Sequence, residues 1–128
     1  MSGTKKDLIS YRLIRAEETF EDSKLLGANS RWNSAINRLY YAAFYAVNAL
    51  LLSSNLSPTT HNGAKTLFSE HFIKPNIIDI EFGKSYSQLF MWRQKGDYDD
   101  LFDFSEEIVS PYFDIVERLI QEVKSKIN

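Results

Sequence analysis

Apolar residues along the chain recur every three or four positions, which is the spacing of one face of an α-helix. The first such segment, residues 5–26, sets Ile9, Leu13, Ala16 and Phe20 on one stripe. The last segment has the cleanest pattern, with apolar positions at Val109, Tyr112, Val116, Leu119, Val123 and Ile127. The period-two alternation of strands is scarce. The pattern therefore predicts an all-α protein.

Residues that start and stop helices predict where the first two helices lie. The first covers about residues 5–26 and ends at Gly27, which suits the C′ position of a helix. The second follows Asn29 and Ser30, either of which can cap a helix, and reaches about residue 52.

Similar signals predict three further helices. Ser57 followed by Pro58 is typical of a capped helix start, and Pro75 ends that third helix. A fourth covers about residues 77–95 and stops at Gly96. For the last helix two starts stay open, a cap at Ser110 with Pro111 in first position, or a start after Ser105 with a kink at the proline. The prediction is an up-and-down bundle of about five helices, forming one domain over residues 1–128.

The second helix is apolar on two faces, which places it in the middle of a bundle or at a dimer contact. One face is a seam of mostly small residues, Ala35, Leu39, Ala42, Ala46 and Ala49, and the opposite face holds Tyr40, Phe44, Val47 and Leu51. A polar stripe runs between them, made of Ser34, Arg38, Tyr41, Tyr45 and Asn48.

Two interpretations of the arginine in that stripe are open. Arg38 either forms a structural ion pair at the helix edge, or lines a cleft together with Tyr41 and Tyr45. In such a cleft the guanidinium would bind a phosphate, and the two phenols would stack or hydrogen-bond.

A second arginine lies near the end of the predicted fourth helix. Arg93 shares an apolar face with Leu89 and Phe90, and Asp97 and Tyr98 follow across the glycine. The arginine and the aspartate are either a structural pair that braces the turn or part of a site.

Composition limits how any nucleic acid could be bound. The net charge is −2 and the sequence pI is about 5.7, so RNA contacts have to come from a local patch. Aromatic residues make up 14% of the chain, which favours a dense core with aromatic surface at a subunit contact.

The absence of cysteine excludes disulfides, thiolate metal sites and a cysteine nucleophile. The most apolar stretch, residues 39–52, is shorter than the ~20 residues that cross a bilayer. We expect a cytoplasmic protein without a membrane segment. The acidic run over residues 97–107 does not fit a calcium loop, because Leu101 and Phe102 stand where an oxygen ligand and a glycine are needed. We expect no metal and no cofactor.

Four segments in this order resemble the HEPN family of small helical proteins: RLYYAAFYAVNALL, THNGAKTLF, MWRQKGDYDD and the amphipathic last helix. The resemblance extends from about Arg12 to Val123. It implies an up-and-down helical bundle that pairs as a homodimer, and active members that are metal-independent ribonucleases. Their signature is an arginine followed four to six residues later by a histidine, at a cleft along the dimer interface.

The resemblance assigns Arg93 to the signature arginine, but the histidine is missing. Tyr98, Asp99 and Asp100 occupy the positions where it would stand. Tyrosine titrates near 10 and aspartate near 4, so neither is suited to proton transfer at neutral pH. The sequence therefore predicts RNA or nucleotide binding, with weak or absent cleavage.

The predicted site has a catalytic part, which is Arg93, Asp97 and Tyr98, and a binding part, which is Arg38, Tyr41, Tyr45 and His61. Many HEPN relatives pair with a small nucleotidyltransferase as toxin and antitoxin, so the resemblance implies such a partner, which could also modify Tyr98. The alternative function is a non-catalytic interaction module that pairs with the nucleotidyltransferase.

Overall fold

Helices make up the described chain, as the apolar periodicity predicts. The computed structural model describes residues 4–98 and 103–127, with the backbone alone for residues 96–98. The helices are α1 (Lys5–Ala28), α2 (Trp32–Ser53), α3 (His61–Phe68), the π-helical turn η1 (Ser69–Ile73), α4 (Ile80–Tyr98), α5 (Glu106–Val109) and α6 (Pro111–Lys126). Because η1 continues α3 directly and α5 leads into α6, these elements form five helical segments. No strand occurs within the described ranges, and the all-α prediction is confirmed.

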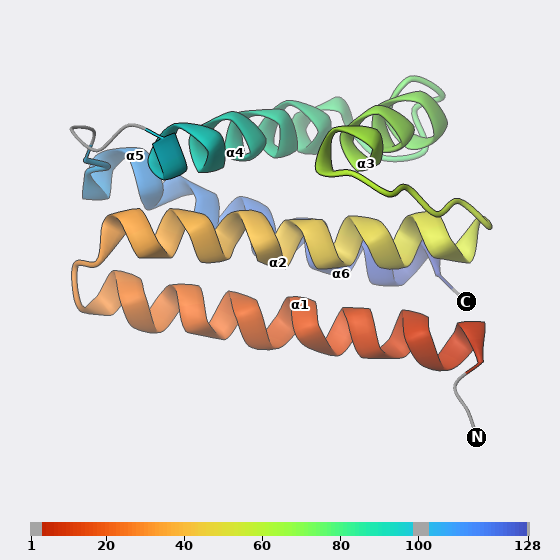
Figure 1. Ribbon diagram of the computed structural model, residues 1–128, viewed down its shortest axis with the longest axis horizontal. Coiled ribbons are helices and arrows are strands. Elements are labelled where there is room, and N and C mark those ends of the chain that lie inside the picture. The colour runs from red at the N-terminus through yellow and green to blue at the C-terminus, as the bar shows by residue number, and fades with distance from the viewer. Residues whose placement is uncertain (1–3, 99–102, 128) are drawn as a thin grey trace.

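The helices run up and down, with α2 in the centre (Figure 1). The helix α1 lies antiparallel along one side of α2, α3 and α4 lie along the other side, and α6 packs behind it (Figure 1). All five residues of the small-residue seam have no exposed surface, because α2 contacts α1, α6, α4 and α3. The seam therefore belongs to the middle of the bundle, and it cannot also be a dimer surface.

The connection between α1 and α2 differs from the prediction, because Gly27 lies inside α1. A Cβ atom on this glycine would come 2.7 Å from Cζ of Phe113, so the glycine permits a close approach of α6. The helix ends at Ala28, and Asn29 is its C-cap, whose Nδ2 donates to the Leu25 carbonyl at 2.9 Å. Ser30 follows with a positive φ of 59°. The pair that was expected to cap α2 thus closes α1.

The start of α3 also differs from the prediction. The helix begins at His61, and Thr60 is its cap, with Oγ1 accepting a hydrogen bond from the Gly63 N–H at 2.8 Å. The predicted start at Ser57 and Pro58 was wrong, because a later threonine supplies the cap. The stop before Pro75 agrees with the prediction, since η1 ends at Ile73.

Both ends of α4 lie further along the chain than predicted. Its start is shifted to Ile80 because Oδ1 of Asp79 accepts the Glu81 N–H at 2.8 Å. Its end lies beyond Gly96, since the helix continues to Tyr98. A glycine costs only about 1 kcal/mol inside a helix, so it does not force an end. The backbone of Asp97 thus belongs to the same helix as Arg93, and no break separates them.

The two starts considered for the last helix are resolved by a cap. Ser105 caps α5, with its hydroxyl accepting from the Ile108 N–H at 3.3 Å. Ser110 has helical φ and ψ and makes no side-chain cap, and Pro111 opens α6. The chain therefore starts a helix after Ser105 and is interrupted at the proline.

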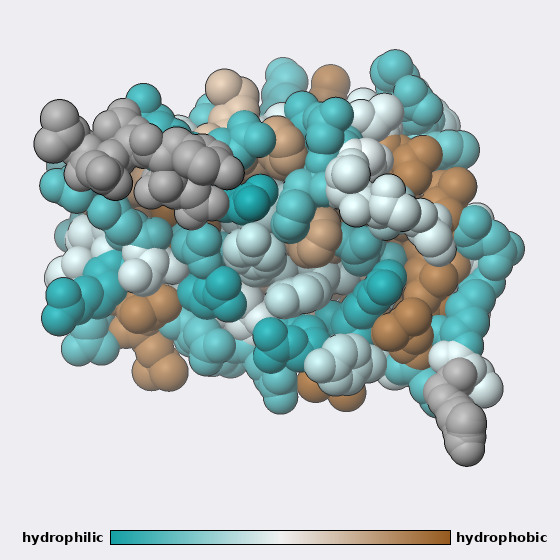
Figure 2. Space-filling model, viewed as in Figure 1, coloured by the Kyte–Doolittle hydropathy of each residue, from teal (hydrophilic) through white to brown (hydrophobic). Residues whose placement is uncertain are grey.

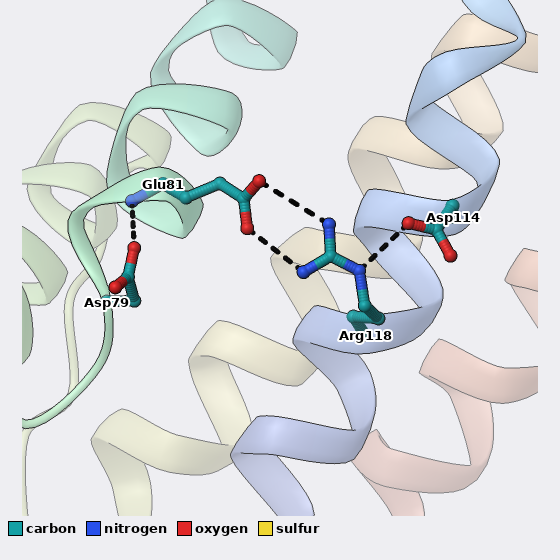
Figure 3. A network of polar contacts seen from close by, with 4 residues as sticks. All are labelled: Asp79, Glu81, Asp114 and Arg118. Carbon is teal, nitrogen blue, oxygen red and sulfur yellow. Dashed lines mark hydrogen bonds and ion pairs between the residues drawn. The ribbon is translucent and has the colours of Figure 1, made fainter.

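An ion-pair network ties the start of α4 to α6 (Figure 3). Arg118 donates through Nη1 to Glu81 Oε1 at 3.0 Å and through Nε to Asp114 Oδ2 at 2.8 Å. These carboxylates, Glu81 first, raise the pKa of Arg118. The network helps to fix α4, the helix that carries Arg93.

One face of the molecule is largely polar (Figure 2). The face in Figure 2 is mostly hydrophilic, with apolar side chains grouped toward its right end. In the described part of the chain, no helix is long and apolar enough to cross a membrane.

Candidate functional site

Two arginines from different helices lie over one tyrosine ring. The Cζ atom of Arg38 lies 5.1 Å from the centroid of Tyr41, and Cζ of Arg93 lies 5.7 Å from it. The His61 ring meets the same tyrosine at 5.8 Å and 85°. We call Arg38, Tyr40, Tyr41, His61 and Arg93 the arginine cluster. It joins α2, α3 and α4.

Arg38 reaches Tyr41 because the two residues are three positions apart on one helix. Its Nε and Nη2 donate to Asn37 Oδ1 at 3.1 and 2.8 Å. It forms no ion pair with a residue in the described ranges. Of the two interpretations from sequence, the structural ion pair is therefore not formed there. The guanidinium is part of the polar stripe, stacked on a phenol.

His61 is held in place by a buried tyrosine. Its Nδ1 lies 2.8 Å from the hydroxyl oxygen of Tyr40, which has no exposed surface. The imidazole also stacks on Phe44, with ring centroids 4.4 Å apart. On its other side, Tyr40 lies 5.5 Å from Cζ of Arg93. These contacts fix the orientation of the imidazole beside the arginine.

The protonation states follow from burial and charge. Partial burial, with the positive charge of Arg93, lowers the pKa of His61 below its usual 6.5. Burial raises the pKa of Tyr40 to about 12. At neutral pH the imidazole is therefore uncharged and the phenol keeps its proton. A neutral imidazole has one donor and one acceptor nitrogen, so Nε2 is left for a ligand once Nδ1 binds Tyr40.

The structure brings together four of the seven predicted site residues, Arg38, Tyr41, His61 and Arg93. Tyr45 lies beside them, 6.2 Å from Tyr41 between ring centroids, but it also contacts Arg15 of α1, whose Cζ lies 5.2 Å from the Tyr45 ring. The side chains of Asp97 and Tyr98 lie outside the described residues, so their predicted roles stay predictions.

Sequence reasoning missed Tyr40, which it placed on the apolar face of the second helix. The residue has no exposed surface, yet its hydroxyl has a specific partner. The signal available was its type, because a buried tyrosine hydroxyl usually needs a hydrogen bond. That reasoning could not name His61 as the partner, since the contact is between two helices.

Metal ligands do not gather in the part of the chain that the structure describes. No group of three or more His, Asp or Glu side chains there could hold a metal ion. Part of the acidic run over residues 97–107 lies outside the described residues.

Comparison with known proteins assigns the family. The family model described as "HEPN domain" matches residues 9–126. The chain belongs to the HEPN family. This confirms the resemblance seen in the sequence, and the helical bundle is the fold that the resemblance implied.

Several HEPN relatives are similar over much of the chain. A protein of Thermotoga maritima named "UPF0332 protein" is 41% identical over 127 residues, covering 94% of this chain and 96% of its own length. A Methanocaldococcus jannaschii protein named "Putative toxin MJ0142" is 34% identical over 93 residues, which are 73% of this chain and 63% of that protein. A second, "Putative toxin MJ0605", is 35% identical over 83 residues, 65% of this chain and 62% of its own.

Proposed function

We propose that this HEPN protein binds phosphate groups of RNA or of a nucleotide at the arginine cluster. One observation carries the proposal: the guanidinium groups of Arg38 and Arg93 lie at 5.1 and 5.7 Å over the Tyr41 ring. The two guanidinium groups bring positive charge to one tyrosine ring in a protein whose net charge is −2. A phosphate is the anion that guanidinium groups bind best, through paired hydrogen bonds.

The other cluster residues suit the remaining parts of a nucleotide. Tyr41 offers an aromatic ring on which a base can stack, a contact worth roughly 1–3 kcal/mol per base. The neutral His61 offers Nε2 as the acceptor of a hydrogen bond from a ribose hydroxyl, in the tautomer whose Nδ1–H donates to the Tyr40 hydroxyl oxygen. Tyr40 keeps that imidazole in place through the 2.8 Å contact.

Slow metal-independent cleavage is the second part of the proposal, because a histidine lies beside the signature arginine even though the signature histidine is absent. His61 Nε2 would take the proton of the ribose 2′-hydroxyl as the 2′-oxygen attacks phosphorus. The phosphorus–O5′ bond then breaks, which gives a 2′,3′-cyclic phosphate. The leaving O5′ takes a proton from solvent to become the 5′-hydroxyl, and the His61 imidazolium returns its proton to solvent. Arg93 would stabilise the charge on the phosphate oxygens.

The biological setting that we propose is a toxin–antitoxin or defence system in the cytoplasm, with the protein as a homodimer and a nucleotidyltransferase as partner. The names of the two Methanocaldococcus jannaschii relatives support the toxin part. The homodimer and the partner follow from the family resemblance.

An interaction module without catalysis is the alternative function, and the surface of α1 favours it. Four large apolar side chains are exposed there, Leu8, Tyr11, Ile14 and Leu25, with exposed fractions of 41% to 66%. Exposed apolar groups on one helix are typical of a protein contact. If Leu25→Lys abolished assembly with a co-expressed nucleotidyltransferase while RNA never bound, this function would replace the first.

The proposed site is tested by incubating the protein with end-labelled single-stranded RNA in EDTA and resolving retardation and cleavage on gels. Arg93→Ala and Arg38→Gln should each weaken retardation by about tenfold or more, the cost of a charge-assisted hydrogen bond. Arg31→Gln is the matched control, since Arg31 is exposed and outside the cluster. Circular dichroism checks the fold. Unchanged retardation in both cluster variants would remove the site.

A further inference from the structure

A groove between α3–η1 and α4 carries three lysines and no acidic side chain among its described lining residues. Its volume is about 570 Å³, within the usual size of ligand sites. Lys65, Lys74 and Lys84 line it, and Phe68 and Ile73 are among the apolar side chains that do so. We call it the lysine groove.

The lysines of this groove are not neutralised by described neighbours. Other lysines of the protein form ion pairs, such as Lys24 with Glu21 and Lys124 with Glu17. Lys65, Lys74 and Lys84 pair with no carboxylate in the described ranges. Lys65 instead lies against the Phe90 ring, with 4.8 Å from Nζ to the centroid. The groove therefore has a positive charge that suits an anion.

A second hollow shows that this arrangement is not general. Lys5, Lys6 and Lys126 line a hollow of about 640 Å³ beside the ends of the chain. There Lys5 donates to Asn55 Oδ1 and Lys126 pairs with Glu122. Two of its three lysines thus have partners, so this hollow serves as a control of equal lysine number.

The lysine groove begins next to the arginine cluster. Lys65 comes four residues after His61 on α3, which places both on one side of that helix, about one turn apart. Phe90 links the two regions, because its ring contacts Lys65 and lies 6.3 Å from the ring of Tyr40. With this spacing along α3, a chain bound at the cluster would enter the groove at Lys65.

We infer that the lysine groove holds the single-stranded RNA that flanks the phosphate bound at the arginine cluster. The inference rests on the proposed function and narrows its ligand to an RNA strand of several nucleotides, as opposed to a free nucleotide. Lysine ammonium groups neutralise successive phosphates, and the apolar lining, with the exposed Met91, accepts bases without reading their edges. Binding through the groove is thus tolerant of sequence.

The test compares two ligands by fluorescence anisotropy or calorimetry. One is an oligouridine of about ten nucleotides, within the range that single-strand sites cover, and the other is uridine 3′,5′-bisphosphate. Lys65→Gln/Lys74→Gln/Lys84→Gln removes the groove charge. Lys5→Gln/Lys6→Gln/Lys126→Gln removes the same charge from the control hollow. The double variant Lys74→Gln/Lys84→Gln changes only two exposed positions, so it still tests the groove if the triple variant does not fold.

The groove variant should bind the oligouridine about tenfold or more weakly at low salt, with a salt slope smaller by roughly 0.7 for each phosphate that is no longer neutralised. Its affinity for the bisphosphate should stay within about twofold of the unchanged protein, because that ligand reaches only the cluster. The double variant should show an intermediate loss of oligouridine affinity, and the control variant should bind both ligands normally.

Two results would overturn the inference and are distinguishable from failure of the proposed function. If the groove variant binds the oligouridine with the affinity and salt slope of the unchanged protein, the groove is not an RNA path, while the cluster still stands through the bisphosphate. If the control variant lost as much oligouridine affinity as the groove variant, the loss would come from net charge and not from the groove. If the unchanged protein binds neither ligand, the proposed function fails and the inference with it.

Discussion

Nδ1 of His61 lies 2.8 Å from the hydroxyl oxygen of Tyr40, so a tyrosine in the middle of α2 holds a histidine at the start of α3. The same tyrosine ring lies 5.5 Å from the guanidinium carbon of Arg93. A histidine is thereby placed beside the family's signature arginine from a different helix, although the residues that follow Arg93 in the sequence contain none. The cluster consequently has an imidazole and a guanidinium without the usual short motif.

Tyr40→Phe should remove the hydrogen bond that orients the His61 ring without leaving a cavity in the core. The substitution keeps the ring and removes the hydroxyl, so we expect a loss of stability of about 1 kcal/mol, as for one hydrogen bond. Nitrogen-15 NMR of the imidazole should show one tautomer in the unchanged protein and mixed tautomers in the variant. His71, which is exposed, is the internal control. If the His61 nitrogens had the same shifts in both proteins, the hydrogen bond would not orient the ring.

The pKa of His61 predicts how stability depends on pH. Burial and the charge of Arg93 lower this pKa in the folded protein below the 6.5 of an unfolded chain, so the unfolded state binds more protons over that interval. Stability is therefore full above about pH 6.5 and is lost as pH falls through and below that value. Denaturant unfolding at several pH values should show this fall.

Two variants separate His61 from the other groups that titrate in the same range. His61→Gln should flatten the dependence of stability on pH near pH 6, and the double variant His61→Gln/His71→Gln shows how much of the remaining dependence belongs to the second histidine. An NMR titration of His61 with a midpoint at or above about 6.5 would contradict the direction of its pKa shift.

Ala42→Leu tests whether the small-residue seam belongs to the interior of one chain. Ala42 has no exposed surface, so a larger side chain should overpack the contacts of α2 and cost about 1–3 kcal/mol or more. Thermal unfolding should shift down by several degrees. A variant with the original stability but an altered oligomeric state by sedimentation would instead place the seam between subunits.

The fold was readable from the sequence because burial follows the helical period over long segments. The apolar stripes of α1 and α6 gave their positions, and the two apolar faces of α2 gave its central place. The ends of helices were harder, because local hydrogen bonds decide them. Thr60 and Asp79 cap α3 and α4, and no pattern in the sequence favours Thr60 over Ser57, three residues earlier.

The contacts of the candidate site could be predicted from the sequence only where its residues share a helix. Arg38 and Tyr41 are three positions apart, so their contact follows from helix geometry. The meeting of His61 with Arg93 depends on how α3 and α4 lie against α2, which periodicity does not specify. Tyr40 was missed for the same reason, since its partner comes from another helix.

The most direct test of the phosphate site is an NMR titration of the protein with uridine 3′,5′-bisphosphate, following the ring signals of His61 and the guanidinium Nε signals of Arg38 and Arg93. We predict that these three side chains shift together and saturate with one dissociation constant, while His71 and Arg31 do not move. Saturation at another surface, or no shift in the cluster at ligand concentrations where RNA is retarded, would contradict the assignment of the phosphate site.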